Sequence, residues 1–124
     1  MPIADADVRW RATLALAQTG DAPDRLLPVF VRLLKDEDGH VRQCAAAGLG
    51  GLGPVGKKGV PALIGALGDR ERYVAREAVD ALNFLGANAR DALPALTKML
   101  REESDGYIRD CILLALKNIG AKRN

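Results

Sequence analysis

Residues 41–53 read Val-Arg-Gln-Cys-Ala-Ala-Ala-Gly-Leu-Gly-Gly-Leu-Gly. The apolar or small residues of this stretch recur at positions i, i+4, i+7, i+8 and i+11, and they are Val41, Ala45, Gly48, Leu49 and Leu52. At about 100° per residue these positions share one face, so the stretch predicts an amphipathic α-helix.

The same pattern returns along the chain with a period of 33 or 34 residues. The four copies begin at Val8, Val41, Val74 and Ile108, and they end at Gly20, Gly53, Gly86 and Gly120. An acidic residue stands just before each copy, at Asp5, Asp38, Glu71 and Asp105. These acids can cap the free N–H groups of a helix start, and a closing glycine suits a left-handed helix end.

A second segment type alternates with the first and is also helical. Its prolines Pro28, Pro61 and Pro94 are spaced by 33 residues. Leucines and other apolar residues follow at helical spacing, which predicts helices at 23–35, 56–68 and 89–101. A proline about one turn into a helix is tolerated because its N–H is little used there. We therefore expect an all-α chain of about seven helices with no strand.

Helix pairs that repeat at a fixed period cannot each bury an apolar face alone, so they must stack into a solenoid. We expect a single domain over residues 1–124, with complete repeats near 22–53, 55–86 and 88–120. A lone helix at 6–19 precedes them without a partner helix. It is either an N-terminal cap or the remnant of a longer array.

The repeat resembles the HEAT-repeat family, particularly its short bacterial form. Pro-Ala-Leu-Ile at 61–64 and the Val-Arg start and Leu-Gly-Gly-Leu-Gly end of 41–53 carry the resemblance. It implies a right-handed α-solenoid whose second helices line the concave face. It also implies pairs between a turn acid and the arginine after the valine, here Asp36 with Arg42 and Glu103 with Arg109. Ala75 and Ile3 depart from this pattern and put a continuous ladder of pairs in doubt.

On the helical wheel, several rows of the second helices point away from the core, and these rows vary from repeat to repeat. They hold the sole histidine and four of the five aromatic residues. The candidate partner-binding residues are Trp10, His40, Tyr73, Arg76, Asp80, Phe84, Tyr107, Asp110 and Leu114. Aromatic and arginine side chains on a rigid face dominate binding energy at protein interfaces. We therefore expect a non-catalytic scaffold that binds another protein.

Nucleic acid binding is the first alternative, and the charge distribution disfavours it. Helices 23–35, 56–68 and 89–101 carry eight Lys/Arg and two Asp, a net charge of +6, whereas the rest of the chain carries ten Lys/Arg and fourteen Asp/Glu. Phosphate binding needs a positive stripe, and the resemblance places this one on the convex side. A second alternative is an accessory subunit like those of phycobilin lyases, whose repeats these resemble.

Catalytic or metal chemistry finds little support. His40 is the only histidine, so a histidine-based metal cluster or relay repeated along the array is excluded. We expect no cofactor and no enzyme activity. The two cysteines, Cys44 and Cys111, lack metal-ligand spacing, and no apolar run suits a membrane span, so we expect a cytoplasmic protein. The unpaired helix 6–19 is a candidate surface for a homodimer.

Overall fold

The computed structural model describes residues 5–19 and 22–120, which form α-helices and short 3-10 helices and contain no strand. The α-helices are α1 (Ala6–Gln18), α2 (Pro23–Leu33), α3 (Gly39–Gly50), α4 (Val60–Ala66), α5 (Arg72–Leu85), α6 (Leu93–Glu102) and α7 (Gly106–Gly120). The 3-10 helices η1 (Gly53–Gly59) and η2 (Gly86–Ala92) lead into α4 and α6. The predicted all-α solenoid of about seven helices is confirmed.

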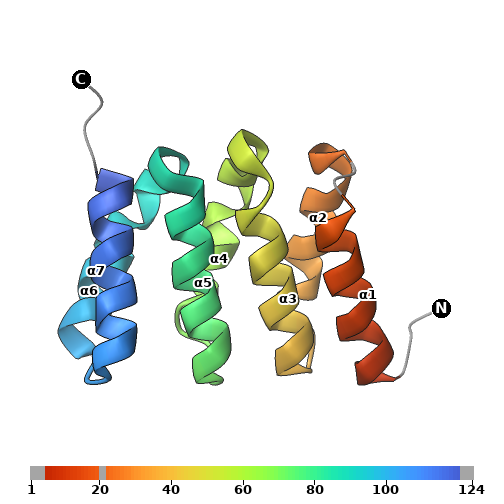
Figure 1. The fold of residues 1–124 in the computed structure, drawn as a ribbon, viewed down its shortest axis with the longest axis horizontal. Helices are drawn as coiled ribbons and strands as arrows, with labels where there is room; N and C mark the ends of the chain where they lie inside the picture. Colours follow the sequence, from red (N-terminus) through yellow and green to blue (C-terminus); the bar gives the residue numbers. More distant parts are fainter. Residues whose placement is uncertain (1–4, 20–21, 121–124) are drawn as a thin grey trace.

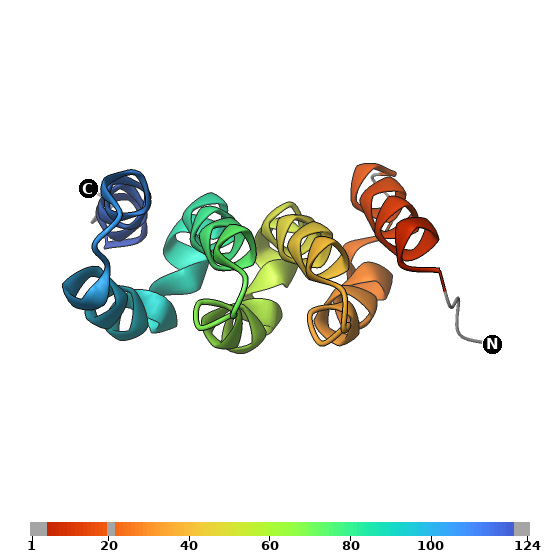
Figure 2. The same cartoon turned by 90° about the horizontal axis from the view of Figure 1, so that it is seen from below.

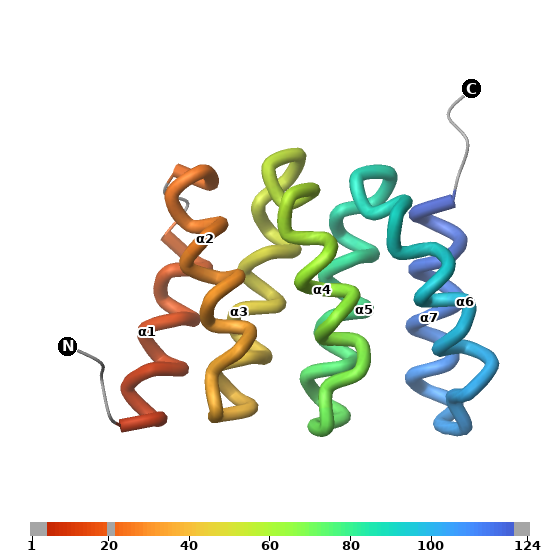
Figure 3. The backbone as a smooth tube through the Cα atoms, turned by 180° about the vertical axis from the view of Figure 1, so that it is seen from behind, coloured from red at the N-terminus to blue at the C-terminus, as the bar shows by residue number. Residues whose placement is uncertain are grey.

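The helices stand in two layers (Figure 1). α1, α3, α5 and α7 lie side by side in one layer, and α2, α4 and α6 form the other, as the view from behind shows (Figure 3). Figure 2 shows that α1 and α7, at the two ends, are displaced away from the α2–α4–α6 layer. The layer of α1, α3, α5 and α7 therefore lines the shallow concave side, and we call its outer surface the concave face.

Two of the predicted helices begin later than the sequence pattern suggested. The pattern placed starts at residues 56 and 89, but α4 begins at Val60 and α6 at Leu93, each after a 3-10 turn. Pro61 and Pro94 thus stand in the first turn of an α-helix, where a missing N–H breaks no helical bond. Pro28 differs because α2 starts a turn earlier and encloses it.

Three of the four predicted N-terminal caps form. The carboxylates of Asp5, Asp38 and Asp105 accept hydrogen bonds from backbone N–H groups in the first turns of α1, α3 and α7. The prediction was wrong for Glu71, whose side chain makes no capping bond to α5. Glutamate carries one more methylene than aspartate, and the residues favoured at this position have short side chains.

Two of the predicted closing glycines, Gly53 and Gly86, have positive φ angles, of 65° and 57°, which residues with a side chain rarely adopt. The left-handed cap itself was wrong for Gly86, which caps α5 with a ψ of −132°, and α3 is capped at Gly51, which has a right-handed helical backbone. The prediction was wrong for Gly120, which is the last described residue, belongs to α7 and has no positive φ. Gly20 lies outside the described residues.

The predicted pattern of buried residues holds in α3, α5 and α7 but not in α1, at one end of the stack. Val41 and Val74 are 0% exposed and Ile108 is 7% exposed, whereas the equivalent Val8 of α1 is 48% exposed. Leu49, Leu82 and Ile112 lie in the continuous core between the two layers. Val8 is exposed because no described helix packs against that side of α1.

Arginine side chains join neighbouring repeats along one edge of the solenoid. The sequence placed the carboxylate of Asp36 opposite Arg42, but Arg42 Nη1 donates instead to the backbone carbonyl of Asp36, at 2.8 Å. Its Nε and Nη2 donate to the Asp69 carboxylate at 2.8 and 3.1 Å. Arg9 makes the same two-pronged contact with Asp36, at 3.0 and 3.1 Å. The carboxylate contact therefore runs between repeats, because the planar guanidinium has enough donors to serve both neighbours.

The ladder continues past the position where the arginine is missing. Arg72 of α5 donates to the carboxylate of Glu103. It thus makes the contact expected of the arginine of the repeat pattern, whose position is occupied here by Ala75. Arg109 contacts Glu103 through the backbone carbonyl, at 2.8 Å, and not through the carboxylate as predicted. Ile3, the other departure, lies outside the described residues.

Candidate functional site

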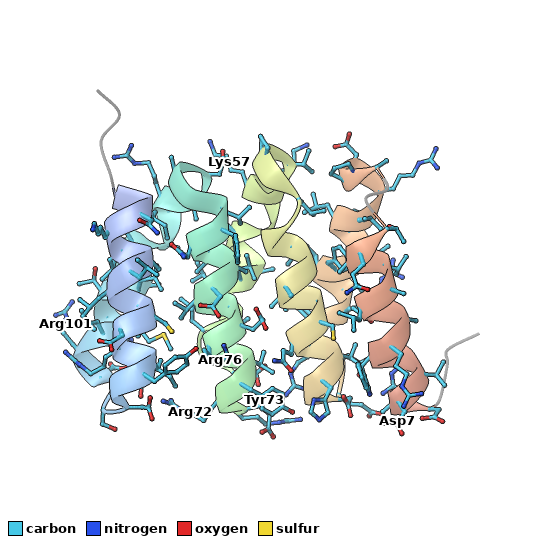
Figure 4. The ribbon with its side chains drawn as sticks, viewed as in Figure 1. Asp7, Lys57, Arg72, Tyr73, Arg76 and Arg101 are labelled. Carbon is cyan, nitrogen blue, oxygen red and sulfur yellow. The ribbon has the colours of Figure 1, made fainter. Side chains whose placement is uncertain are left out.

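All nine residues proposed from the sequence lie on the helices of the concave layer, and none of them is fully buried. Figure 4 shows Asp7, Tyr73 and Arg76 on this layer, toward the lower ends of the helices in that view. The placement follows from helical geometry, because the apolar stripe of each helix faces the α2–α4–α6 layer and leaves the opposite side free.

Three rings from successive helices form an aromatic row. The rings of Trp10 and His40 have centroids 6.3 Å apart, and the His40 and Tyr73 rings are stacked with centroids 5.2 Å apart. The Tyr73 ring also lies over Gly39, where an added Cβ would meet its hydroxyl at 2.2 Å. A hollow of about 390 Å³ opens beside the row, lined by Asp7, Trp10, His40, Gln43 and Cys44. Each ring of this row therefore contacts a ring from the neighbouring helix.

A second group of large side chains is much more exposed. Phe84 of α5 is 80% exposed, and Tyr107 and Leu114 of α7 are 63% and 51% exposed. The Arg76 guanidinium lies 6.0 Å from the centre of the Tyr107 ring, a cation–π distance. Among the described residues no ring contact reaches Phe84. The structure thus brings Trp10, His40 and Tyr73 together and leaves Phe84 apart from them.

Acidic side chains occupy the middle of the face. Asp80 accepts a hydrogen bond from Arg76 at 3.3 Å, one turn earlier on α5. Burial raises the pKa of Glu77, and the nearby Asp80 carboxylate raises it further. Burial also raises the pKa of Asp80, although Arg76 opposes that shift. Glu77 and Asp80 are therefore carboxylates held beside each other in partial burial, which favours a positive group from outside.

The cysteines of this face are not activated thiols. Cys44 and Cys111 are free thiols, and burial raises the pKa of both, which disfavours the thiolate. In the described ranges no group of three or more His, Cys, Asp and Glu residues could hold a metal ion. Within the same ranges, no helix combines the length and the apolar character needed to span a membrane.

A second hollow, of about 400 Å³, lies at the edge where the turns join the helices, beside the arginine–carboxylate pairs between repeats. It is lined by Lys35, Asp36, Glu37, Arg42, Asp69 and Arg70. Hydrogen bonds from Arg42 and from the Glu71 backbone N–H outweigh burial and lower the pKa of Asp69. The Arg42–Asp69 ion pair and the arginine contacts with the Asp36 and Glu37 carbonyls account for this hollow as part of the packing between repeats.

Sequence reasoning missed two features of the concave face. The Arg11 guanidinium lies 5.6 Å from the centre of the Trp10 ring, although consecutive helical residues do not normally face each other. Glu77 lies in a candidate row, but its partial burial depends on how closely α3 and α5 approach. The aromatic row depends on the same helix spacing, which no pattern within one helix reveals.

Comparison with known proteins agrees with this architecture. A family model described as HEAT repeats matches residues 3–58 and again residues 45–117. The two matches overlap and together cover most of the chain. No curated protein matches it.

Proposed function

Because the chain belongs to the HEAT-repeat family, whose members are generally scaffolds for protein interaction, we propose that it is a non-catalytic scaffold that binds another protein through the concave face. The observation that carries this proposal is the exposure of Phe84 and Tyr107, at 80% and 63%, on that face. The remaining phenylalanine, Phe30, is 0% exposed in the core. Large rings left in water on a rigid surface are typical of binding anchors.

The arrangement of side chains supports a preorganised site. The rings of the aromatic row contact one another across α1, α3 and α5, so binding would restrict few additional side-chain rotamers. Phe84, Tyr107 and Leu114 extend the apolar area across α5 and α7. A partner that covers the face would bury these groups together, and each buried large apolar side chain contributes roughly 1.5–3 kcal/mol.

The charges of the face favour a partner with basic side chains. Glu77 and Asp80 carry raised pKa values because they are partly buried, and Asp110 on α7 is exposed. An arriving Lys or Arg would stabilise the ionised carboxylates. The same acids would repel phosphate, so this face suits a basic protein segment and not nucleic acid.

Affinity capture from a lysate of the source cells tests the proposal. Wild-type chain would be compared with a Phe84→Ala/Tyr107→Ala variant, whose two rings are exposed and can be removed without opening the core. A Lys57→Ala/Lys58→Ala variant, altered at exposed residues of η1, is the matched control. Circular dichroism would establish that all three are folded.

We expect a protein that wild type and the lysine variant retain and that the ring variant loses. Capture of the same protein by all three would show that the concave rings do not bind it. If nucleic acid is the dominant captured species and only the lysine variant loses it, the binding site lies on the basic α2–α4–α6 layer instead. The capture of a pigment-carrying antenna protein would favour the lyase-like alternative.

A further inference from the structure

The hollow beside the aromatic row lies between two neighbouring helices of the concave layer. α1 contributes Asp7 and Trp10 to its lining, and α3 contributes His40, Gln43 and Cys44. Its volume of about 390 Å³ lies at the lower end of the range found for ligand pockets. The chemistry of these five side chains therefore decides what fits it.

Asp7 gives the hollow a negative charge that the chain does not pair. Its side chain is exposed in the first turn of α1, and among residues 5–19 and 22–120 no basic side chain forms an ion pair with it. Arg9 pairs instead with Asp36 and Glu37 at the turn edge. Arg11, one turn after Asp7, lies against the Trp10 ring and is not among the residues that line the hollow.

The other walls of the hollow add an aromatic face, an acceptor and a neutral thiol. The face of the Trp10 ring attracts cations. Burial raises the pKa of the Cys44 thiol, and the charge of Glu77 raises it further, so the thiol stays uncharged. The Gln43 amide group donates to Glu77, which leaves its carbonyl oxygen as an acceptor. These groups together favour a positively charged hydrogen-bond donor.

Between α5 and α7 the chain places a cation of its own in the corresponding position. Arg76 of α5 corresponds in the repeat to Trp10 of α1, and Tyr107 of α7 corresponds to His40 of α3. The Arg76 guanidinium lies 6.0 Å from the centre of the Tyr107 ring and donates to Asp80 at 3.3 Å. The repeat thus already holds a guanidinium between a ring and a carboxylate. Between α1 and α3 a ring replaces that arginine, and a hollow is left beside it.

We propose that the hollow between α1 and α3 binds a basic side chain of the partner, arginine in preference to lysine, with its cationic group beside the Trp10 ring and the Asp7 carboxylate. This inference rests on the proposed function, because it specifies how the concave face holds a basic protein segment. Arginine fits better than lysine, since its planar group stacks on a ring and offers donors to two acceptors at once.

Titration with short blocked peptides tests the proposal before any partner is known. The probes are acetyl-Gly-Arg-Gly-amide and the same peptide with neutral citrulline or with glutamate in place of arginine. Trp10 is the only tryptophan and His40 the only histidine, so tryptophan fluorescence and the NMR signals of the histidine ring both report on this hollow. We expect the arginine peptide to change both signals with a Kd on the order of 1 mM. The citrulline peptide should bind at least about tenfold more weakly, because it lacks the charge.

Two exposed charges at the hollow give opposite predictions. Asp7→Asn should weaken binding of the arginine peptide at least about threefold, because it removes the negative charge and keeps the size of the side chain. Arg11→Gln should strengthen binding about twofold, because it removes a competing positive charge from the same ring. Asp91→Asn, at an exposed residue of η2, makes the same change of charge in the other layer and should leave binding unchanged. Circular dichroism would establish that all variants are folded.

Equal binding of the arginine and citrulline peptides, or tighter binding of the glutamate peptide, would overturn the proposal. No change in either signal up to about 10 mM would overturn it as well, and so would binding of the arginine peptide that Asp7→Asn leaves unchanged. Each of these results leaves the proposed function standing, because capture of a partner through Phe84 and Tyr107 does not need the hollow. Wild type that binds the arginine peptide as expected but captures no protein would overturn the proposed function and not the hollow.

Discussion

Arg42 on α3 and Asp69 in the turn before α5 are 27 residues apart, and they form a two-pronged ion pair with Nε–Oδ2 and Nη2–Oδ1 distances of 2.8 and 3.1 Å. The two side chains are only 7% and 11% exposed. Arg42 also donates to the backbone carbonyls of Asp36 and Glu37. One side chain therefore ties the turn of its own repeat to the turn of the next, and it fixes how the repeats stack.

Arg42→Met is expected to lower the free energy of unfolding by about 3 kcal/mol, because it leaves the Asp69 carboxylate and two carbonyls without their donor in partial burial. Arg76→Met is the control, since the Arg76–Asp80 pair is a more exposed pair one turn apart, worth under about 0.5 kcal/mol. Urea unfolding followed by circular dichroism measures both. If both variants lower the free energy of unfolding by the same amount, the arginine–carboxylate pairs between repeats do not hold the repeats together.

Asp69→Asn should destabilise the fold at neutral pH and make little difference in acid. The folded-state pKa of Asp69 is lowered, so its contribution is present above the unfolded pKa of about 4 and is lost as the pH falls through the folded value. Thermal melts of wild type and variant at pH 7 and pH 3 measure the effect. A gap between the two melting temperatures that stays as wide at pH 3 would contradict this assignment.

Glu77→Gln should stabilise the fold at neutral pH, whereas Asp69→Asn should destabilise it. Burial and the neighbouring Asp80 raise the folded pKa of Glu77 above its unfolded value, so the ionised form costs stability at pH 7. That cost fades as the pH falls from the folded pKa toward the unfolded value of about 4.3. The variant should therefore melt at a higher temperature than wild type at pH 7 and at a similar one at pH 3. A lower melting temperature at pH 7 would mean that Glu77 makes a stabilising contact instead.

Gly48 and Gly51 should respond to alanine in opposite directions. An added Cβ at Gly48 would lie 2.6 Å from the Phe30 ring, and the buried ring cannot move without disturbing the core. Gly48→Ala is therefore expected to cost about 1–3 kcal/mol. At Gly51 the nearest atom would be 3.6 Å away, so Gly51→Ala should gain up to about 1 kcal/mol. Denaturant midpoints of the two single variants check this, and stabilisation by Gly48→Ala would contradict the close packing.

The repeat period and the core rows could be predicted from the sequence because they depend on spacing within one helix. Val41 and Val74 recur every 33 residues, and both are completely buried. The partner of Arg42 could not be predicted, because Asp36 is near in sequence whereas Asp69 becomes near only when the repeats stack. The substitution of Arg72 for the arginine missing at Ala75 is a local rearrangement that the pattern does not contain.

The candidate site was predictable as a face and not as a set of contacts. Helical geometry placed Phe84 and Tyr107 on the side away from the core, and both are well exposed. The stacking of His40 on Tyr73, at 5.2 Å, depends on the spacing of α3 and α5 and on side-chain rotamers. Small residues set that spacing, since an added Cβ at Gly50 would lie 2.8 Å from the backbone of Ala81.

Hydroxyl-radical footprinting of the chain, with and without the protein that it captures, tests directly whether the partner binds the concave face. This measurement reports the solvent exposure of individual side chains. If the partner binds the concave face, oxidation of Phe84 and Tyr107 falls sharply in the complex, while Met99 on α6, in the other layer, keeps its reactivity. Protection of Met99 with unchanged oxidation of Phe84 and Tyr107 would place the partner on the convex side and rule out binding at the concave face.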